Sequence, residues 1–478
     1  MVSGIDRKIT RETFTFVPTM TSCTILFHLV CCILMGLMTS SKPLSILLLQ
    51  SLPSTSHHIW ATNLVKGLLR EGHQVHAVST LKTKVEGKLA QNLTYAVFEG
   101  LMNSSDKYED YGPAQWEKYN AFHMAYVTYQ WAIYGCDRVI KTNAAKELLE
   151  MIKTVKFDVI VQDVTLHQCL YGLWKPLHEI EKDSINIVLI NSYCAFEPGI
   201  PLPPNALETG GLHVQVVQPI VGDVVVTYSE DVRIFLDGAK TGVIVISLGT
   251  NLKWKTVELN KIKSIVLALS KLKQRVLWKL DAKAKVPFKI PDNVMTVKWI
   301  PQREVLSHKN VKAFWAQGGL LSTQEAIWEG IPMIITPFFM DQKSNAEILV
   351  AKGVGIRLDF KILSTQSVLH AIEEIFYNKS YTKNMKRLSS EFRDRPLPPL
   401  DLAIWSIEHA ARQPNGSLTT PLRSQSWVEQ NLIDVYAFLV FTVFNLLIIL
   451  LSVFFALKLL INFCYNRIVS KLSKSKQS

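Results

Sequence analysis

The stretch from Trp299 to Asn345 constrains the fold most, because it predicts two strand–turn–helix units in succession. Residues 311–315 (VKAFW) form a short run rich in apolar β-branched and aromatic side chains, which is typical of a buried strand. The run leads to the pair Gly318-Gly319, after which a helix is predicted. Residues 332–337 (PMIITP) predict the next strand. Strands that alternate with helices in this way favour an α/β fold with a parallel sheet.

The turns after these two strands have the features of a phosphate-binding site. A diglycine lets a ligand approach the backbone closely, and the free N–H groups of the following helix favour a phosphate. Ser322 stands three residues before Glu325, which is the spacing of a helix capping box. Asp341 and Gln342 follow the second strand, at the edge where open α/β sheets place their ligands.

The polar residues of this stretch form a long pattern: W-x-P-Q, H-x5-F, G-G-x-x-S-x-x-E, G-x-P and D-Q-x-x-N. It closely resembles the signature of the UDP-glycosyltransferases, the family that includes the UDP-glucuronosyltransferases. The resemblance implies the GT-B fold, an α/β architecture in which two doubly wound Rossmann-like domains face each other across a cleft. The first domain would bind the acceptor, and the second would bind the UDP-sugar.

The resemblance also implies roles for individual residues. Trp299 would stack on uracil, Gln302 would bind the uridine, and Glu325 would accept from the ribose hydroxyls. Asp341 and Gln342 would read the sugar hydroxyls. Thr250, Gly319 and Ser322 would lie against the diphosphate. The other residues assigned to the UDP-sugar site are Gly249, Gln317 and Gly318. No cofactor or metal is implied, because the helix dipole and side chains replace the cation. His308 is interpreted as structural.

A histidine suits the base that deprotonates the acceptor, because its pKa lies near neutrality. The family places this base in a Ser-His segment after the first strand, paired with an aspartate after a later strand. Residues 44–50 (LSILLLQ) predict that first strand, and Ser56-His57 follows in a loop before a helix predicted over residues 59–70. Asp163 follows the strand predicted at residues 157–161. His58 remains the alternative base.

Two departures from the family pattern bear on activity. The residue before the diglycine is histidine in the family and Gln317 here, and losing a charged bond to phosphate would cost about 1–2 kcal/mol, or roughly tenfold in rate. The first domain also lacks several helices and a strand, because Asp163 lies close to Gly249 in the chain. The alternative to an active enzyme is therefore a catalytically impaired UDP-sugar-binding or regulatory partner of active family members.

Two apolar segments predict the compartment. Residues 25–38 have the profile of a secretory signal, with Met1 or Met20 as the start. Residues 436–457 carry no charge over 22 positions, enough to cross a hydrocarbon core of about 30 Å, and the tail after them is basic. We therefore expect a single-pass type I protein of the endoplasmic reticulum membrane, with most of the chain lumenal. The ending KSKQS resembles a retrieval signal.

The remaining features agree with a lumenal chain. Its sequons predict glycosylation at four positions, which are Asn92, Asn103, Asn378 and Asn415. The three cysteines between the apolar segments are an odd number, which argues against a disulfide framework. The net charge of +12 is scattered and no nucleic-acid motif accompanies it, so the expected partners are a UDP-sugar, a small lipophilic acceptor and the membrane. Relatives also imply homo- or hetero-oligomers.

These observations divide the chain into six parts. The predicted parts are a leader and signal at 1–40, an acceptor-binding domain at 41–228, a UDP-sugar-binding domain at 229–412, a membrane-proximal segment at 413–435, a transmembrane helix at 436–461 and a cytoplasmic tail at 462–478. A helix at residues 401–412, after a proline-rich turn, is expected to return to the first domain.

Overall fold

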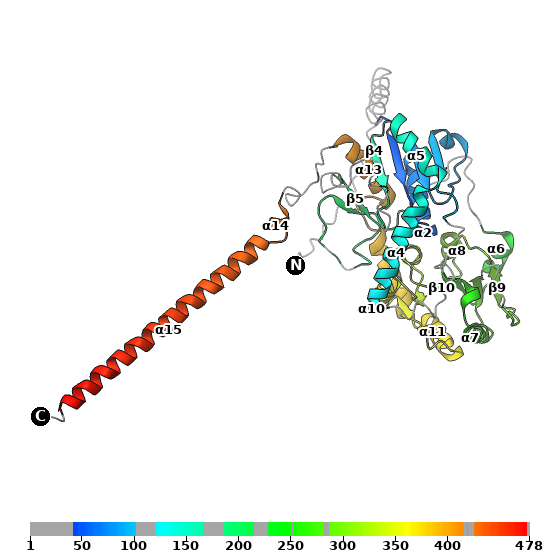
Figure 1. Ribbon diagram of the computed structural model, residues 1–478. Coiled ribbons are helices and arrows are strands. Elements are labelled where there is room, and N and C mark those ends of the chain that lie inside the picture. Colours follow the sequence, from blue (N-terminus) through cyan, green and yellow to red (C-terminus); the bar gives the residue numbers. More distant parts are fainter. Residues whose placement is uncertain are drawn as a thin grey trace, which may run out of the picture. The chain divides into compact units, whose positions relative to one another are not determined.

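A computed structural model of the chain describes residues 42–101, 120–165, 170, 185–197, 199, 201–214, 228–250, 252–280, 286–414, 418 and 425–475. Figure 1 names the helices and strands used below. The predicted signal segment and the sequons at Asn103 and Asn415 lie outside the described residues. Asn92 and Asn378 are described and exposed.

The first domain is built on a parallel sheet with the strand order β3-β2-β1-β4. Its strands are β1 (Ser45–Leu49), β2 (Gln74–Ser79), β3 (Leu93–Val97) and β4 (Val159–Gln162). Its helices are α2 (Thr55–Arg70), α4 (Ala121–Ile140) and α5 (Asn143–Thr154), with the short turn η1 (Gly87–Asn92) before β3. Because β1 and β4 are parallel neighbours, the segments after both strands meet at one edge of the sheet.

Helix α2 begins four residues earlier than the sequence predicted, at Thr55. The prediction followed the apolar spacing and therefore left both histidines in a loop. Ser54, a residue type that favours helix N-termini, has extended backbone angles and stands at the N-cap position. His57 and His58 consequently lie in the first turn of the helix, which holds their backbone in a fixed geometry.

The short strand that follows in the chain does not join the first sheet. It forms β5 (Val188–Ile190), which pairs in parallel with β6 (Ala206–Glu208) in a separate two-stranded sheet. Within the described residues β4 is therefore an edge strand. This arrangement is what a first domain short of a strand would produce.

The second domain contains a six-stranded parallel sheet of order β12-β11-β10-β7-β8-β9. The strands are β7 (Val243–Ser247), β8 (Arg275–Lys279), β9 (Val294–Val297), β10 (Val311–Ala316), β11 (Met333–Ile335) and β12 (Gly355–Arg357). Its helices are α6 (Glu230–Asp237), α7 (Leu259–Leu269), α8 (Gln302–Leu306), α9 (Leu320–Glu329), α10 (Gln342–Ala351), α11 (Thr365–Tyr377) and α12 (Lys379–Arg393), with the turn η4 (Trp254–Thr256).

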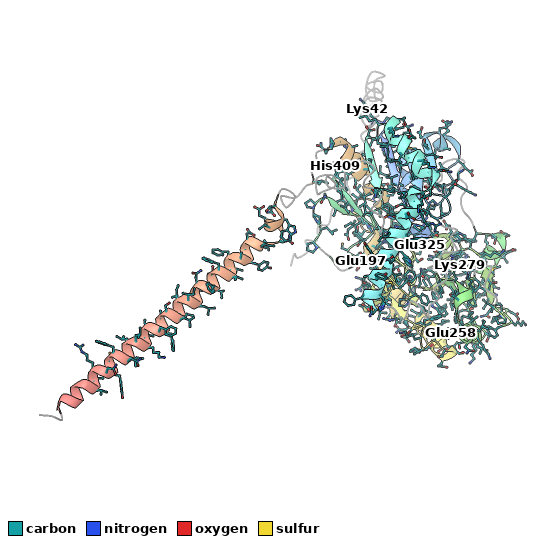
Figure 2. All side chains as sticks on the ribbon, in the orientation of Figure 1. Lys42, Glu197, Glu258, Lys279, Glu325 and His409 are labelled. Atoms are coloured by element: carbon teal, nitrogen blue, oxygen red, sulfur yellow. The ribbon has the colours of Figure 1, made fainter. Side chains whose placement is uncertain are left out.

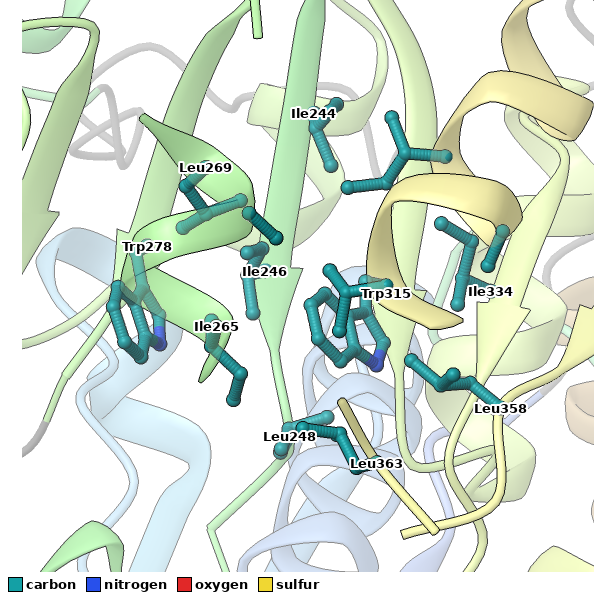
Figure 3. Close-up of a cluster of buried hydrophobic side chains, with 14 of the residues drawn as sticks. Ile244, Ile246, Leu248, Ile265, Leu269, Trp278, Trp315, Ile334, Leu358 and Leu363 are labelled. Carbon is teal, nitrogen blue, oxygen red and sulfur yellow. The ribbon is translucent and has the colours of Figure 1, made fainter. Parts of the chain in front are cut away.

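Successive residues of β7 point to opposite faces of this sheet, and both faces are buried. Ile244 and Ile246 join one apolar cluster with Trp278 and Trp315, as Figure 3 shows, whereas Val245 joins the cluster on the other face. A central parallel strand needs apolar residues at every position for this reason. The continuous apolar run at residues 243–246 is typical of such a buried strand.

Helix α13 (Pro399–Arg412) returns to the first domain, as predicted. It begins two residues before the predicted start, because Pro399 is tolerated in the first turn of a helix. It packs on α2, where a Cβ on Gly67 would lie only 2.9 Å from Leu400 and 3.0 Å from Ile404. The close approach of the two helices requires the missing side chain of Gly67.

The chain ends in the short helix α14 (Trp427–Gln430) and the long helix α15 (Ile433–Ser475), drawn in red at the C-terminal end in Figure 1. Within the described residues one helical stretch, Ile433–Val469, is long and apolar enough to span a membrane. It contains the predicted span at 436–461. The tail predicted from residue 462 continues the helix to Ser475. Among the described cysteines, Cys136 is disulfide-bonded, whereas Cys194 and Cys464 are free.

Candidate functional site

His57 and Asp163 meet at the edge formed by β1 and β4. The backbone N–H of Asp163 donates to Leu49 O at 2.9 Å, which fixes the residue at the end of β1. Nδ1 of His57 donates to Oδ2 of Asp163 at 2.6 Å, so the lone pair of the other ring nitrogen, Nε2, can accept a proton. Burial alone would raise the pKa of Asp163, but the hydrogen bond and charge of His57, with bonds from Thr165, hold that pKa below its usual value.

His58 is oriented differently, towards β2. Its Nδ1 donates to Oγ of Ser79 at 3.0 Å, and Ser79 in turn donates to Oε1 of Gln50 at 2.6 Å. Its Nε2 accepts from Oγ1 of Thr62 at 3.3 Å, and burial lowers the pKa of His58. Both ring nitrogens therefore have hydroxyl partners within the protein. This geometry favours His57 as the base.

On the second domain, a carboxylate, an amide and a hydroxyl form one connected group. Nε2 of Gln302, the first residue of α8, donates to Oγ of Ser322 at 2.9 Å and also to Oε2 of Glu325 on α9. The Glu325 side chain is only 14% exposed. This burial raises the pKa of Glu325 to about 7, although the hydrogen bond from Gln302 acts to lower it. Figure 2 labels Glu325 among the side chains. Three of the predicted nucleotide-binding residues are thus brought together.

The indole of Trp299 is 56% exposed, as expected of a surface on which a base stacks. The ammonium of Lys279, at the end of β8, lies 4.5 Å from the centroid of this ring. Nζ of Lys279 also donates to Gly249 O at 3.3 Å, and Nζ of Lys253 donates to Thr250 O at 3.1 Å. Burial and then the charge of Lys253 lower the pKa of Lys279. Neither lysine was predicted from the sequence, although Lys279 stands at the end of the largely buried strand β8.

The turn between β10 and α9 differs from the predicted capping box. Helix α9 begins at Leu320 with Gly319 as its N-cap, so Ser322 lies inside the first turn. Asp341 replaces the cap, because its Oδ2 accepts from Leu320 N at 3.1 Å. The first backbone hydrogen bond of the helix is donated by the N–H of Thr323 to Gly319 O, at 3.0 Å. The N–H groups of Leu321 and Ser322 precede it in the chain and therefore have no acceptor within the helix.

Asp341 and its neighbours link the two turns. Nδ2 of Asn345 donates to Gly318 O at 2.8 Å and to Oδ2 of Asp341 at 2.9 Å, which explains the asparagine in D-Q-x-x-N. Enclosure of its carboxyl group raises the pKa of Asp341; the bonds from Leu320 and Asn345, and finally the charge of His57, oppose this. His57 of the first domain therefore acts electrostatically on Asp341 of the second.

Gln342, predicted to read the sugar, is 3% exposed. Its Oε1 accepts from the backbone N–H groups of Phe338 at 2.9 Å and Phe339 at 3.3 Å. The side-chain carbonyl therefore supports the loop after β11. Only its amide N–H groups remain to meet a ligand.

Gln317 lies against Gly249. Its side chain is mostly buried, and within the described part of the chain its Oε1 has no hydrogen-bond partner. Gly249 has φ +74°, and a Cβ there would collide with the amide nitrogen of Gln317. Gly318 also requires glycine, since at φ +85° its Cβ would lie 2.7 Å from Ile335.

We expect Gly249→Ala to destabilise the protein more than Gly72→Ala. Gly72 also has positive φ, +84°, but nothing lies within 4 Å of its Cβ position. Both substitutions should cost about 1–2 kcal/mol for left-handed backbone, and only Gly249→Ala should add the collision with Gln317. Thermal unfolding of both variants in detergent checks this. Equal losses would show that Gln317 moves aside freely.

A cavity of about 520 Å³ lies beside β12, the edge strand of the second sheet. Its lining includes Arg357, His370, Glu374 and Tyr381. None of the predicted site residues lines it, so it is separate from the group formed by Gln302, Ser322 and Glu325.

Comparison with known proteins gives three results. The sequence profile of the family described as UDP-glucoronosyl and UDP-glucosyl transferase matches residues 170–475. UDP-glycosyltransferase UGT5 of Dactylopius coccus is 33% identical over 294 residues, which cover 61% of this chain and 54% of that protein. UDP-glucuronosyltransferase 2B1 of Rattus norvegicus is 36% identical over 266 residues, 55% of this chain and 48% of that protein. The chain spans about half the length of these curated relatives.

Two solved structures share the fold. The calicheamicin glycosyltransferase CalG4 has a TM-score of 0.54 at 15% identity, covering 78% of this chain and 99% of that chain. The glycotransferase of kitacinnamycin has a TM-score of 0.51 at 16% identity, covering 77% of this chain and 100% of that chain. At these identities the likeness concerns the fold alone, and it confirms the predicted GT-B architecture.

Proposed function

Because this chain belongs to the UDP-glycosyltransferase family, we propose that it transfers a hexosyl or glucuronosyl group from a UDP-sugar to a hydroxyl of a small lipophilic acceptor. The observation that carries this proposal is the His57–Asp163 pair at 2.6 Å, whose histidine also influences the pKa of Asp341 in the nucleotide-binding domain. A base on one domain and a sugar-binding carboxylate on the other are what transfer between two bound substrates requires.

The proposed mechanism is a single displacement with inversion at the anomeric carbon. Nε2 of His57 takes the proton of the acceptor hydroxyl while the oxygen bonds to the anomeric carbon, and the bond from that carbon to UDP breaks. Asp163 accepts from Nδ1 and stabilises the imidazolium that forms, as in hydrolase triads. UDP leaves with the bonding electron pair, and the acceptor leaves as its glycoside.

The negative charge on departing UDP needs positive partners. We assign this role to Lys279 and Lys253, which donate to the backbone at Gly249 and Thr250, together with the N-terminal N–H groups of α9. Uracil would stack on Trp299, and Glu325 with Gln302 would bind the ribose. With these groups the proposed reaction needs no metal, and activity should survive chelation by EDTA.

We further propose a type I topology in the endoplasmic reticulum, with α15 crossing the membrane and both domains lumenal. The apolar stretch Ile433–Val469 supports the anchor. The exposed sequons Asn92 and Asn378 support the lumenal side. A mobility shift after endoglycosidase H treatment that both Asn→Gln substitutions reduce is the expected result.

The direct test of the activity uses microsomes that express the full chain. Labelled UDP-sugars and phenolic acceptors are supplied, and glycoside formation is measured together with UDP release. Glycoside formed in stoichiometric amounts with UDP supports the proposal. Binding of UDP-sugar without transfer would support the alternative, a regulatory or UDP-sugar-binding partner of active family members, which the separate β5–β6 sheet and Gln317 favour.

Replacing Gln317 by histidine should raise the transfer rate roughly tenfold. A protonated imidazole adds a charge-assisted bond to the leaving diphosphate that the neutral amide cannot make, a difference of about 1–2 kcal/mol. The matched control is Gln317→Asn, which keeps an amide and should give no gain. A Gln317→His variant no faster than wild type would remove this residue as the cause of any low activity.

A further inference from the structure

A buried segment outside the predicted motif, residues 209–214, packs against α9, the helix proposed to bind the nucleotide. Residues 209–214 follow β6 and precede the second domain in the chain. Thr209, Leu212 and Val214 are fully buried, and His213 is 6% exposed. The segment lies against α9, the helix that carries Ser322 and Glu325.

Helix α9 is tied to this segment through Gln324, which is 1% exposed. Oε1 of Gln324 accepts from Gly211 N at 3.0 Å, and its Nε2 donates to Asn191 O at 3.2 Å. Gly210 permits the contact, because a Cβ there would lie 2.6 Å from the backbone of Ser192 and 3.0 Å from Nε2 of Gln324. The amide of Gln324 therefore has matched partners for both its oxygen and its nitrogen.

His213 makes the contact closest to the chemistry. Its Nε2 donates to Leu321 O at 3.2 Å and lies 3.9 Å from Oε1 of Glu325. Leu321 and Glu325 are one helical turn apart and share a face of α9. The imidazole thus contacts the first turn of the helix and faces one oxygen of the carboxylate, while Gln302 binds the other oxygen.

The protonation state of His213 fits a fixed donor. Burial lowers the pKa of His213 to about 4, so the ring is neutral near pH 7, and its single proton lies on Nε2, which faces a carbonyl. Its Nδ1 is buried and has no hydrogen-bond partner among the described residues. The other charged groups that influence Glu325 are Arg303 and Glu304 on α8 and Glu329 on α9.

We propose that His213 is a positioning residue for nucleotide binding, which fixes the first turn of α9 and holds the Glu325 carboxylate where it accepts the ribose hydroxyls. This inference rests on the proposed function, since it requires a UDP-sugar at Glu325. Binding sites depend on supporting residues that lock the contacting side chains, and a displacement of about 1 Å can cost up to about 100-fold. His213 does not touch the reacting atoms.

The test compares His213→Phe with His213→Gln in the full chain. Phenylalanine keeps most of the volume but cannot donate to Leu321 O, whereas the Gln amide can donate from nearly the same position. We expect His213→Phe to raise KM for the UDP-sugar about tenfold with a small change in kcat, because binding in ground state and transition state is lost equally. His213→Gln should stay within about threefold of wild type. His370→Gln, an exposed histidine on α11, controls for the substitution itself.

A second readout does not depend on catalysis. Hydrogen–deuterium exchange in the first turn of α9 should accelerate in His213→Phe and remain slow in His213→Gln. Unchanged KM and unchanged exchange in His213→Phe would overturn the inference. An equal change of KM and exchange in both variants would also overturn it, because the hydrogen bond would then be irrelevant.

If wild type binds no UDP-sugar, the proposed function fails, and the nucleotide role of His213 fails with it. Exchange in α9 then still decides whether the contact to Leu321 holds the helix.

Discussion

Replacing His57 by alanine should lower kcat for glycosyl transfer about 10²–10⁴-fold while UDP-sugar affinity stays close to that of wild type. General base catalysis by a positioned histidine contributes this range, and no second base is paired with a carboxylate at this edge among the described residues. The proposed donor-binding group lies on the other domain, around Glu325, and does not include His57. Single-turnover transfer and equilibrium binding of the UDP-sugar measure the two quantities separately.

Asp163→Asn tests the partner. The amide keeps the shape of the side chain but cannot accept from Nδ1 with a negative charge, so the imidazolium loses its stabilisation and the ring can turn to the wrong tautomer. We expect a loss of kcat nearly as large as that of His57→Ala. The double variant should lose little more than either single one, because the two residues act as a unit.

His58→Gln is the matched control for the neighbouring histidine. Its contacts to Ser79 and Thr62 are internal, so we expect reduced thermal stability and a much smaller effect on kcat. A large loss of kcat in His58→Gln with normal activity in His57→Ala would contradict the assignment. It would show that the ring of His58 leaves Ser79 when an acceptor binds.

The sheet could be predicted strand by strand because burial imposes a local signature. Both faces of β7 are covered, so residues 243–246 are all apolar, and the polar Ser247 comes only at the end of the strand. The pattern of the turns proposed to bind the nucleotide was also visible, since a diglycine and an acidic residue at fixed spacing are local features. The architecture could therefore be predicted from local sequence, and the proposed donor-binding residues were identified from the same local patterns.

Features that depend on distant contacts could not be predicted. The cap of α9 comes from Asp341, which follows the next strand, so the local spacing of Ser322 and Glu325 suggested a capping box that does not form. His213 carries no motif, and only its distance to Leu321 shows its relevance. The choice between His57 and His58 likewise depends on which ring reaches Asp163.

The last prediction concerns the pH dependence conferred by Glu325. Its folded pKa, about 7, lies above the ordinary value of 4.5, so the folded protein binds the proton more tightly than the unfolded chain does. The stability from this group is fully present below pH 4.5 and is lost as pH rises through 7, a loss of about 3 kcal/mol. Glu325→Gln should remove this slope and unfold at a higher temperature than wild type at pH 8.

His213 contributes the opposite slope. Its folded pKa, about 4, lies below 6.5, so its stabilisation is present above pH 6.5 and is lost as pH falls towards 4. Between pH 4.5 and 6.5 the two groups oppose each other in wild type. The difference in unfolding temperature between wild type and Glu325→Gln isolates the Glu325 contribution, and it should be small at pH 5 and largest at pH 8.

The affinity for UDP-sugar should depend on the same proton of Glu325, but it should rise with pH, whereas the stability falls. Only the ionised carboxylate can accept from two ribose hydroxyls, so affinity should fall about tenfold per pH unit below 7 and level off above it. A UDP-sugar serves better than UDP here, because a terminal phosphate has its own pKa near 6. Glu325→Gln should bind about 10–100-fold more weakly at pH 8, with no such slope. If wild type and Glu325→Gln share one pH profile, Glu325 does not bind the ribose, because removing its proton would then leave the affinity unchanged.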